Sequence, residues 1–170
     1  MSNDVRFGEA IQVLPVLAPV AAITNDAARY TSFVDLALAH WVTFIVQFGA
    51  ISATDTGLIT VAVEGSTTGA DSDTEANVNF SYRISHAIGA APSMGTLTAC
   101  ASSNTNTVAS SDVANALLVI EVNPDECTDY RYVRVSIDPA ADTTSYFSNA
   151  IAVKHPRYVG ATIPSLFTAT

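Results

Sequence analysis

Residues 77–84 read NVNFSYRI, and their alternation indicates the fold class. Val78, Phe80, Tyr82 and Ile84 share one parity, and the residues between them are polar. Successive side chains of a β-strand point to opposite faces of its sheet. The pattern therefore predicts a strand with one buried face and one solvated face.

The same two-residue period recurs on both sides of this stretch. It is found in TVAVE (residues 60–64), in WVTFIVQFG (41–49) and in LLVIEV (117–122). In residues 41–49 both parities are largely apolar, which predicts a central strand. The β-branched residues of 117–122 fit a short strand.

Residues 129–138, DYRYVRVSID, predict a further strand with a mixed outer face. The apolar parity is expected to point inward and the other parity outward: Val133, Val135 and Ile137 against Tyr130, Tyr132, Arg134 and Ser136. A turn at residues 138–144 separates this strand from residues 145–154. We expect these two segments to form an antiparallel hairpin.

Turn-rich connectors at residues 65–76 and 101–112 separate the expected strands, and no long amphipathic helix is evident. These features predict an all-β fold, an antiparallel β-sandwich of jelly-roll-like kind with extended N- and C-terminal arms. Residues 1–35 are expected to hold the N-terminal arm and the first strand region. Residues 36–154 would form the sandwich, and residues 155–170 the C-terminal tail.

Both ends of the chain contain prolines among apolar residues, without sustained alternation. Proline cannot donate to a β-ladder, so these ends are interpreted as arms or edge pieces. They either fold back over the sandwich or reach into neighbouring subunits. The apolar residues expected at such an interface are Phe7, Ile11, Leu14, Val16 and Leu17 at one end, and Val159, Ile163, Leu166 and Phe167 at the other.

The charge balance argues against nucleic acid as a partner. The chain has seven Lys and Arg residues, a formal net charge of −9 and a pI of about 4.4. Binding to phosphate polymers depends on clustered basic residues. Tyr130 and Tyr132 therefore fit a protein interface better, since tyrosine is enriched there. The low charged fraction, 14%, fits either a β-protein whose surface is coated with Ser and Thr or one with much surface buried against partners.

No arrangement of side chains predicts an enzyme or a cofactor site. His40, His86 and His155 lie far apart, and no nucleophile motif or phosphate-binding loop occurs. Asp71, Asp73 and Glu75 could offer oxygen ligands to calcium, but they lack the EF-hand pattern. We expect these three to be exposed in a solvated loop without a metal.

Cys100 and Cys127 are too few for a disulfide scaffold. They are expected to be free thiols, with a single bridge as the alternative. No apolar run reaches the length of about 20 residues that a membrane-spanning helix needs. The N-terminal stretch also lacks the net positive charge of a signal peptide. We therefore expect neither a membrane-spanning helix nor secretion through a signal peptide.

A succession of stretches resembles a known family. It consists of WVTFIVQFGA, TVAVEGS, NFSYRI, VIEVNPDECTDYRYVRVSID and a final RYVGA. Taken over residues 30–160, it resembles the decoration, or cement, proteins of tailed-bacteriophage capsids. The resemblance implies a β-rich domain, commonly trimeric, on the outer capsid surface. It implies no catalytic residues.

The expected function is therefore that of a structural virion protein. Its partners would be the major capsid protein and further copies of itself as a homotrimer, with no cofactor. It would bridge capsomers on the capsid surface after assembly in the host bacterial cytoplasm. The alternative from a different class is a carbohydrate- or receptor-binding β-module of a tail fibre or adhesin.

Overall fold

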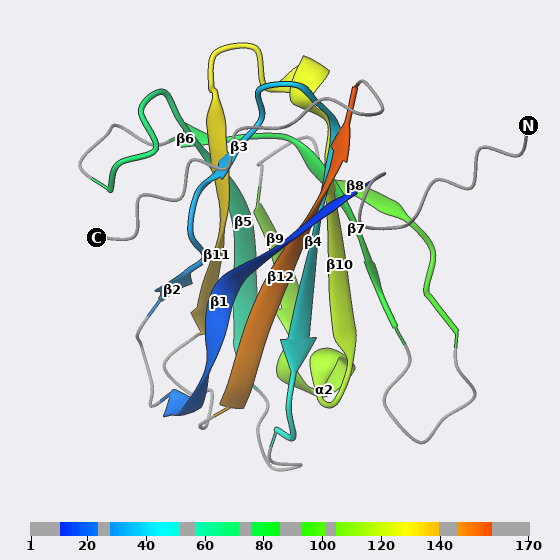
Figure 1. Cartoon of the computed structure of the whole chain (residues 1–170). Coiled ribbons are helices and arrows are strands. Elements are labelled where there is room, and N and C mark those ends of the chain that lie inside the picture. The colour runs from blue at the N-terminus through cyan, green and yellow to red at the C-terminus, as the bar shows by residue number, and fades with distance from the viewer. Residues whose placement is uncertain are drawn as a thin grey trace, which may run out of the picture.

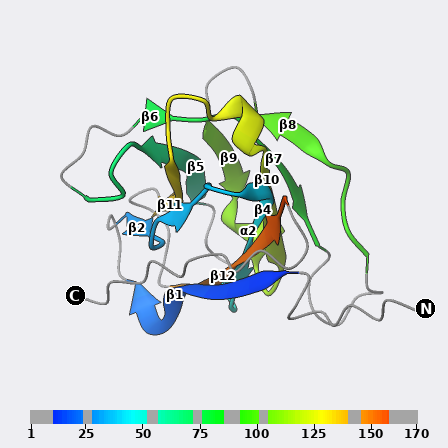
Figure 2. The ribbon, with the colours of Figure 1, turned by 45° about the horizontal axis from the view of Figure 1, so that its top comes forward.

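The protein folds into two antiparallel β-sheets packed face to face (Figures 1 and 2). The structure is a computed structural model and describes residues 11–23, 28–51, 57–71, 76–85, 93–100, 105–139 and 146–157. Sheet A contains, in spatial order, β1 (Gln12–Ile23), β12 (Tyr146–Pro156), β4 (Ala39–Phe48), β10 (Leu117–Val122), β7 (Phe80–Ile84) and β8 (Thr98–Cys100). Sheet B contains β2 (Arg29–Tyr30), β11 (Tyr132–Pro139), β5 (Leu58–Ser66) and β6 (Ala76–Asn77), with β3 (Val34–Asp35) on β11 and β9 (Thr105–Ala109) on β5.

The strand order is that of a jelly roll. Without the additions β6, β7 and β8, sheet A runs β1-β12-β4-β10, and sheet B runs β2/β3-β11-β5-β9. Each sheet thus alternates strands from the two halves of the chain, as two intertwined Greek keys require. Two short helices, α2 (Ser110–Val113) and η1 (Pro124–Glu126), lie in the connections. The predicted all-β sandwich is confirmed.

The core lies between the sheets and is filled by the inward parity of the long strands. Its largest completely buried side chains come from both layers: Phe44, Phe48, Ile59, Leu118, Ile120 and Ile137. Full burial of such a side chain stabilises the fold by roughly 1.5–3 kcal/mol relative to exposure. The expected inner row Val133, Val135 and Ile137 is confirmed, because all three are completely buried.

Two expectations about strand pairing are wrong. Residues 77–84 are not one strand, because the chain leaves sheet B after β6 and enters sheet A at β7, with Val78 buried at the crossing. Strands β11 and β12 do not form a hairpin either. They lie in different sheets, where β11 pairs with β5 and β12 pairs with β4. Alternation predicts which face is buried but not which strand is the partner.

Of the two alternatives for the N-terminal region, residues 12–23 follow the one in which the chain folds back over the sandwich. These residues form β1, which pairs antiparallel with β12 from Gln12–Lys154 to Ile23–Tyr146. Val16 is buried in the core, and Leu14 and Leu17 pack against it. Strand β1 lies at the edge of sheet A. Pro15 has no N–H to donate, and an edge strand tolerates this because no further strand pairs with its outer side. The chain therefore folds back here.

Candidate functional site

The outer face of sheet A is apolar across four strands. One cross-strand row runs through Pro15 of β1, Ile151 of β12, Ile45 of β4 and Val119 of β10, each paired with the next by register. Ile151 is 40% exposed, and Ile45 and Val119 are half-buried. The row therefore presents a continuous hydrophobic stripe toward solvent.

Apolar residues flank this row on both sides. Val13 of β1, which is 45% exposed, pairs with Val153 of β12, and Trp41 and Leu117 extend the apolar surface at its two ends. We call this surface the sheet A patch, and it comprises Val13, Pro15, Trp41, Ile45, Leu117, Val119, Ile151 and Val153. Figure 1 shows its strands β1 and β12 in front, and Figure 2 shows them on the side opposite β5 and β11.

Polar groups border the patch. An ion pair joins Arg83 of β7 to Glu121 of β10 at 3.2 Å, and Thr43, Gln47 and Asn149 also point to this face. Arg83 ends the apolar row on β7, because it is the register partner of Val119. An apolar centre with a polar rim is the usual anatomy of a protein interface.

The outer face of sheet B has the opposite character. Eight of its outward residues are polar or small, and two exposed apolar or aromatic residues, Leu58 and Tyr30, share this face: the eight are Thr60, Ala62, Glu64, Thr105, Thr107, Arg134, Ser136 and Asp138. Both sheets bury apolar inner faces, so the core does not account for the contrast between the outer faces. The outer face of sheet B is therefore the more polar of the two, and the apolar outer face of sheet A loses free energy by remaining in water.

The size of the sheet A patch can be estimated from strand geometry. Four strands at about 4.8 Å spacing and six residues at about 3.3 Å rise give a footprint of about 400 Å², an upper bound on the apolar area because Thr43 and Gln47 lie within it. Apolar patches of about 300–600 Å² on monomers are often functional. A stable standard interface needs about 800 Å² per partner. The patch alone therefore suits a weak contact that gains strength when several copies engage together.

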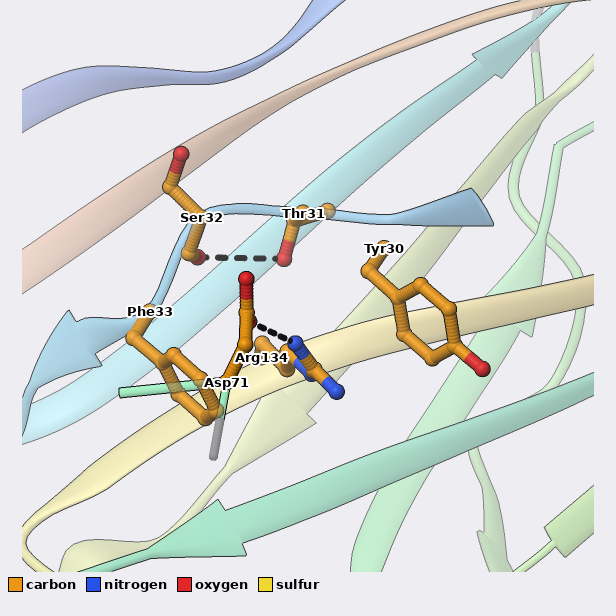
Figure 3. Close-up of a pocket in the computed structure, with 6 residues that line it drawn as sticks. All are labelled: Tyr30, Thr31, Ser32, Phe33, Asp71 and Arg134. Carbon is orange, nitrogen blue, oxygen red and sulfur yellow. Dashed lines mark hydrogen bonds and ion pairs between the residues drawn. The ribbon is translucent and has the colours of Figure 1, made fainter. Parts of the chain in front are cut away.

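A second feature lies on sheet B and centres on Arg134. The guanidinium carbon lies 4.3 Å from the centroid of the Tyr30 ring and 4.7 Å from that of the Phe33 ring. Arg134 Nε donates to Glu64 Oε2 at 2.8 Å, and Nη1 donates to Asp71 Oδ1 at 2.5 Å. Figure 3 shows the guanidinium between the two rings, with Asp71 beside it.

Local hydrogen bonds hold the segment that carries the two rings. Thr31 exchanges two bonds with Val135 of β11: its amide donates to the Val135 carbonyl, and its Oγ1 accepts from the Val135 amide. Arg29 crosses to sheet A, where its Nη1 donates to the carbonyl and hydroxyl oxygens of Ser148. Residues 29–33 are therefore anchored to both sheets, and the rings flank Arg134 at defined positions.

A cavity of about 480 Å³ opens at this cluster. Its lining residues are Tyr30, Thr31, Ser32, Phe33, Asp71 and Arg134. Tyr30 is 46% exposed and the Asp71 side chain is 87% exposed, whereas Arg134 is buried. The cavity thus has a rigid charged floor and an open rim that carries an aromatic ring and a carboxylate.

An ionic cluster at one end of the sandwich joins sheet A to sheet B. Arg131 donates to both carboxylate oxygens of Asp35, from Nε at 3.2 Å and from Nη2 at 2.9 Å. Lys154, buried in β12, donates from Nζ to the carbonyl oxygen of Asp35 at 2.6 Å. Burial is the largest influence on the Asp35 carboxyl and raises its pKa. The Arg131 and Ala37 hydrogen bonds and the charges of Arg131 and Lys154 outweigh it and hold this pKa below its ordinary value.

We expect Asp35 to contribute to acid denaturation. Because its pKa is lower in the folded protein than in the unfolded chain, its stabilising effect is complete above the ordinary carboxyl pKa. The effect is lost as the pH falls through the folded value. The gap in unfolding free energy between the wild type and Asp35→Asn should be constant near neutral pH and shrink below about pH 4. Urea melts across this range test it, and a gap independent of pH would contradict it.

Tyr130 and Tyr132 pack on glycines of their own chain. A Cβ built on Gly65 would lie 2.5 Å from Tyr130 Cγ, and one built on Gly69 would lie 3.0 Å from the Tyr132 ring. Tyr130 also packs against the core, and Arg131 lies over the Tyr132 ring at 5.3 Å. Part of each tyrosine is therefore used within the fold, and their interface role stays a prediction.

Gly65→Ala should destabilise the protein by about 1–3 kcal/mol, the usual cost of overpacking. The added methyl group would meet the Tyr130 ring, which must move away from the core. Thermal or urea unfolding of this variant measures the effect. Ala62→Gly, at another position of β5, is a control for strand propensity. A melting temperature for Gly65→Ala equal to that of the wild type would show that Tyr130 relaxes at no cost.

The remaining predicted interface residues divide into two groups. Ile11, Leu14, Val16 and Leu17 lie in or next to β1, and Val16 is only 4% exposed, so it is not available to a partner. The interface role of the partly exposed residues stays a prediction. The others lie outside the described residues: Phe7, Val159, Ile163, Leu166 and Phe167.

Sequence reasoning missed most of the sheet A patch and all of the Tyr30–Phe33–Arg134 stack. The apolar second parity of residues 41–49, which contains Trp41 and Ile45, was a visible signal for the patch. Arg134 was correctly placed on the outer parity of its strand. No signal in the sequence links it to Tyr30 and Phe33, about 100 positions earlier.

Both cysteines are free and buried, as expected. Burial, with a smaller effect from the Glu126 charge, raises the pKa of Cys127 to about 11, and burial also raises the pKa of Cys100. Both thiols are thus protonated at neutral pH and are poor nucleophiles. Asp71 is exposed as expected, whereas Asp73 and Glu75 lie outside the described residues.

The described part of the chain contains neither a metal-binding cluster nor a membrane-spanning helix. No group of three or more His, Cys, Asp or Glu side chains there could hold a metal ion. Among the same residues, no helix has the length and apolar character needed to cross a bilayer. The metal-free loop expected at Asp71, Asp73 and Glu75 stays a prediction.

Comparison with known proteins gives a likeness in structure only. No protein-family model matches the chain, and no curated protein matches it. One similar solved structure contains the CBM22-1 and GH10 modules of the Clostridium thermocellum endo-1,4-beta-D-xylanase 10B, complexed with xylohexaose. The match has 11% identity and a TM-score of 0.34, and it covers 95% of this chain and 28% of that chain. A likeness at this TM-score says nothing of function.

Proposed function

We propose that the chain is a structural virion protein that binds the outer surface of a tailed-phage capsid and bridges its capsomers. The observation that carries this proposal is the sheet A patch, an apolar outer face on a sandwich whose other outer face is polar. A surface of this kind favours a protein partner, because burying it recovers free energy that solvent exposure costs. The partner is the major capsid protein.

The charge distribution supports a protein shell rather than nucleic acid. Arg29, Arg131, Arg134, Lys154 and Arg157 each have an acidic or carbonyl partner within the fold. The net charge is −9, so the exposed surface repels phosphate polymers at long range. A protein with this balance can coat a shell that contains DNA without binding DNA released from broken particles.

The small size of the patch supports an oligomeric form. About 400 Å² is half of what a stable standard interface needs on each partner. A homotrimer presents three such patches to a shell with local threefold symmetry. Its second and third contacts then form at high effective concentration. Bridging between capsomers follows from this arrangement, since different patches of one trimer contact different capsid subunits.

The test is the composition of purified particles from the phage genome that encodes this chain. Quantitative mass spectrometry should find the chain in copy numbers comparable to those of the major capsid protein. A virion placement on the capsid surface, after assembly in the host cytoplasm, requires this result. Absence of the chain from particles, or presence only at the few copies typical of a tail component, would contradict the proposal.

A further inference from the structure

The cavity at Arg134 has features that the capsid role does not use. It lies on the polar sheet B, whereas the proposed attachment surface lies on sheet A. Its volume of about 480 Å³ falls in the range of small-ligand sites, roughly 300–1,000 Å³. The Tyr30 ring and the Asp71 carboxylate stand at its open rim (Figure 3). A ligand-binding role of this cavity is therefore independent of the proposed capsid role.

The charges around the cavity exclude two classes of ligand. A cation would seek the space between the Tyr30 and Phe33 rings, but the Arg134 guanidinium already occupies it. An anion would seek Arg134, but Glu64 and Asp71 already accept hydrogen bonds from that guanidinium. These two carboxylates against one guanidinium leave an excess of negative charge, which repels phosphate, sulfate and carboxylate groups.

The remaining chemistry suits a neutral molecule with many hydroxyl groups. The Asp71 side chain is 87% exposed, and its Oδ2 can accept from a hydroxyl while Oδ1 stays on Arg134. Arg134 covers one side of the Tyr30 ring, and the part that stays exposed offers apolar surface for the C–H face of a sugar ring, with the hydroxyl as a further polar contact. We propose that this cavity is a binding site for a neutral saccharide of one or two residues.

The positions of Tyr30 and Arg134 are set before a ligand arrives. Hydrogen bonds of Thr31 and Arg29 hold the Tyr30 segment on both sheets. Arg134 is held by its hydrogen bond to Glu64, the residue opposite it on β5. Preorganised groups lose little conformational entropy on binding, so a shallow site can still bind at millimolar to micromolar dissociation constants. Multiple copies on one particle would strengthen attachment to a glycan-coated surface further.

The experiment is saturation-transfer NMR of the full chain with a panel of free sugars. The panel contains glucose, galactose, mannose, N-acetylglucosamine, xylose and rhamnose, with glucuronic acid and sialic acid as anionic comparisons. At least one neutral sugar should give a transfer signal, and it should bind more tightly than either acid. Titration then gives its dissociation constant. Absence of a signal for every neutral sugar at about 10 mM, or tighter binding of the acids, would overturn the proposal.

Variants locate the site. Tyr30→Ala should abolish the signal and Tyr30→Phe should retain it, because the ring carries the stacking surface. Asp71→Asn should weaken binding about tenfold through loss of a charged acceptor. Asp125→Asn is the matched control, since Asp125 is also an exposed aspartate ion-paired with an arginine, Arg157, and should bind as the wild type does.

Thermal melts accompany each variant. If Tyr30→Ala does not fold, Asp71→Asn still decides, because its side chain is mostly exposed. Sugar binding that neither Asp71→Asn nor a folded Tyr30→Ala weakens would place the site elsewhere and overturn the proposal.

Discussion

Deletion of residues 1–24 is expected to destabilise the protein by about 4 kcal/mol, whereas deletion of residues 1–10 leaves it folded. The longer deletion removes β1, so it removes Val16 from the core and the packing of Leu14 and Leu17 against it. One fully buried valine and two half-buried leucines account for this magnitude. The loss also exposes β12 as a new sheet edge, which promotes aggregation.

Urea unfolding followed by circular dichroism measures both deletions. Since natural domains have only about 5–15 kcal/mol of stability, the longer deletion should bring the protein close to unfolding. Val16→Ala is a milder companion and should cost roughly 1–3 kcal/mol without changing the chain length. A deletion of residues 1–24 as stable as the full chain would show that β1 is a dispensable arm.

Lysine substitutions at Ile151 and Val119 should weaken binding to undecorated capsids at least 100-fold. Both side chains lie in the central row of the sheet A patch, on opposite sides of β4. Each lysine replaces apolar contact area and must be desolvated if the patch is to be buried. Because Ile151 is 40% exposed and Val119 is half-buried, the isolated protein should lose little stability.

Co-sedimentation with capsids stripped of the chain measures this effect. Thr107→Lys is the control, because Thr107 is exposed on the polar outer face of sheet B. It adds the same charge and should bind as the wild type does. If Thr107→Lys lost affinity to the same degree as the patch variants, net charge rather than the sheet A patch would govern binding.

Much of the fold can be predicted from the sequence, because burial of one strand face imposes an alternation of apolar and polar residues. Residues 117–122 form β10 with the predicted bounds, since their alternation reflects one face in the core. The central position of β4 was also predicted, because both its faces are apolar. The partners of each strand were not predicted. Register and pairing depend on contacts between residues far apart in the chain, and the false hairpin of β11 and β12 came from their proximity in sequence.

The N-terminal region shows why the sequence leaves a paired edge strand and a free arm as alternatives. Prolines at positions 15 and 19 disrupt the alternation, and β1 has register shifts at Pro15/Leu17 and Leu17/Val20. Such irregularity is tolerated because an edge strand needs hydrogen bonds on one side only. Proline alone therefore cannot distinguish a paired edge from a free segment.

The candidate sites could be predicted only in part. The apolar outer parity of β4 pointed toward the sheet A patch, but the patch exists only because β1, β12 and β10 align similar residues beside it. The Arg134 cavity depends on Tyr30 and Phe33 from one segment and Asp71 from another. Tertiary structure alone brings these three segments together.

A cryo-EM reconstruction of the native phage particle tests the central claim most directly. We predict jelly-roll density on the outer capsid surface at sites of local threefold symmetry, with the sheet A patch against the shell. In that orientation Ile45, Val119 and Ile151 contact the major capsid protein, and the Arg134 cavity faces solvent. A capsid surface without this density, or a bound domain with sheet A facing solvent and sheet B against the shell, would contradict the account.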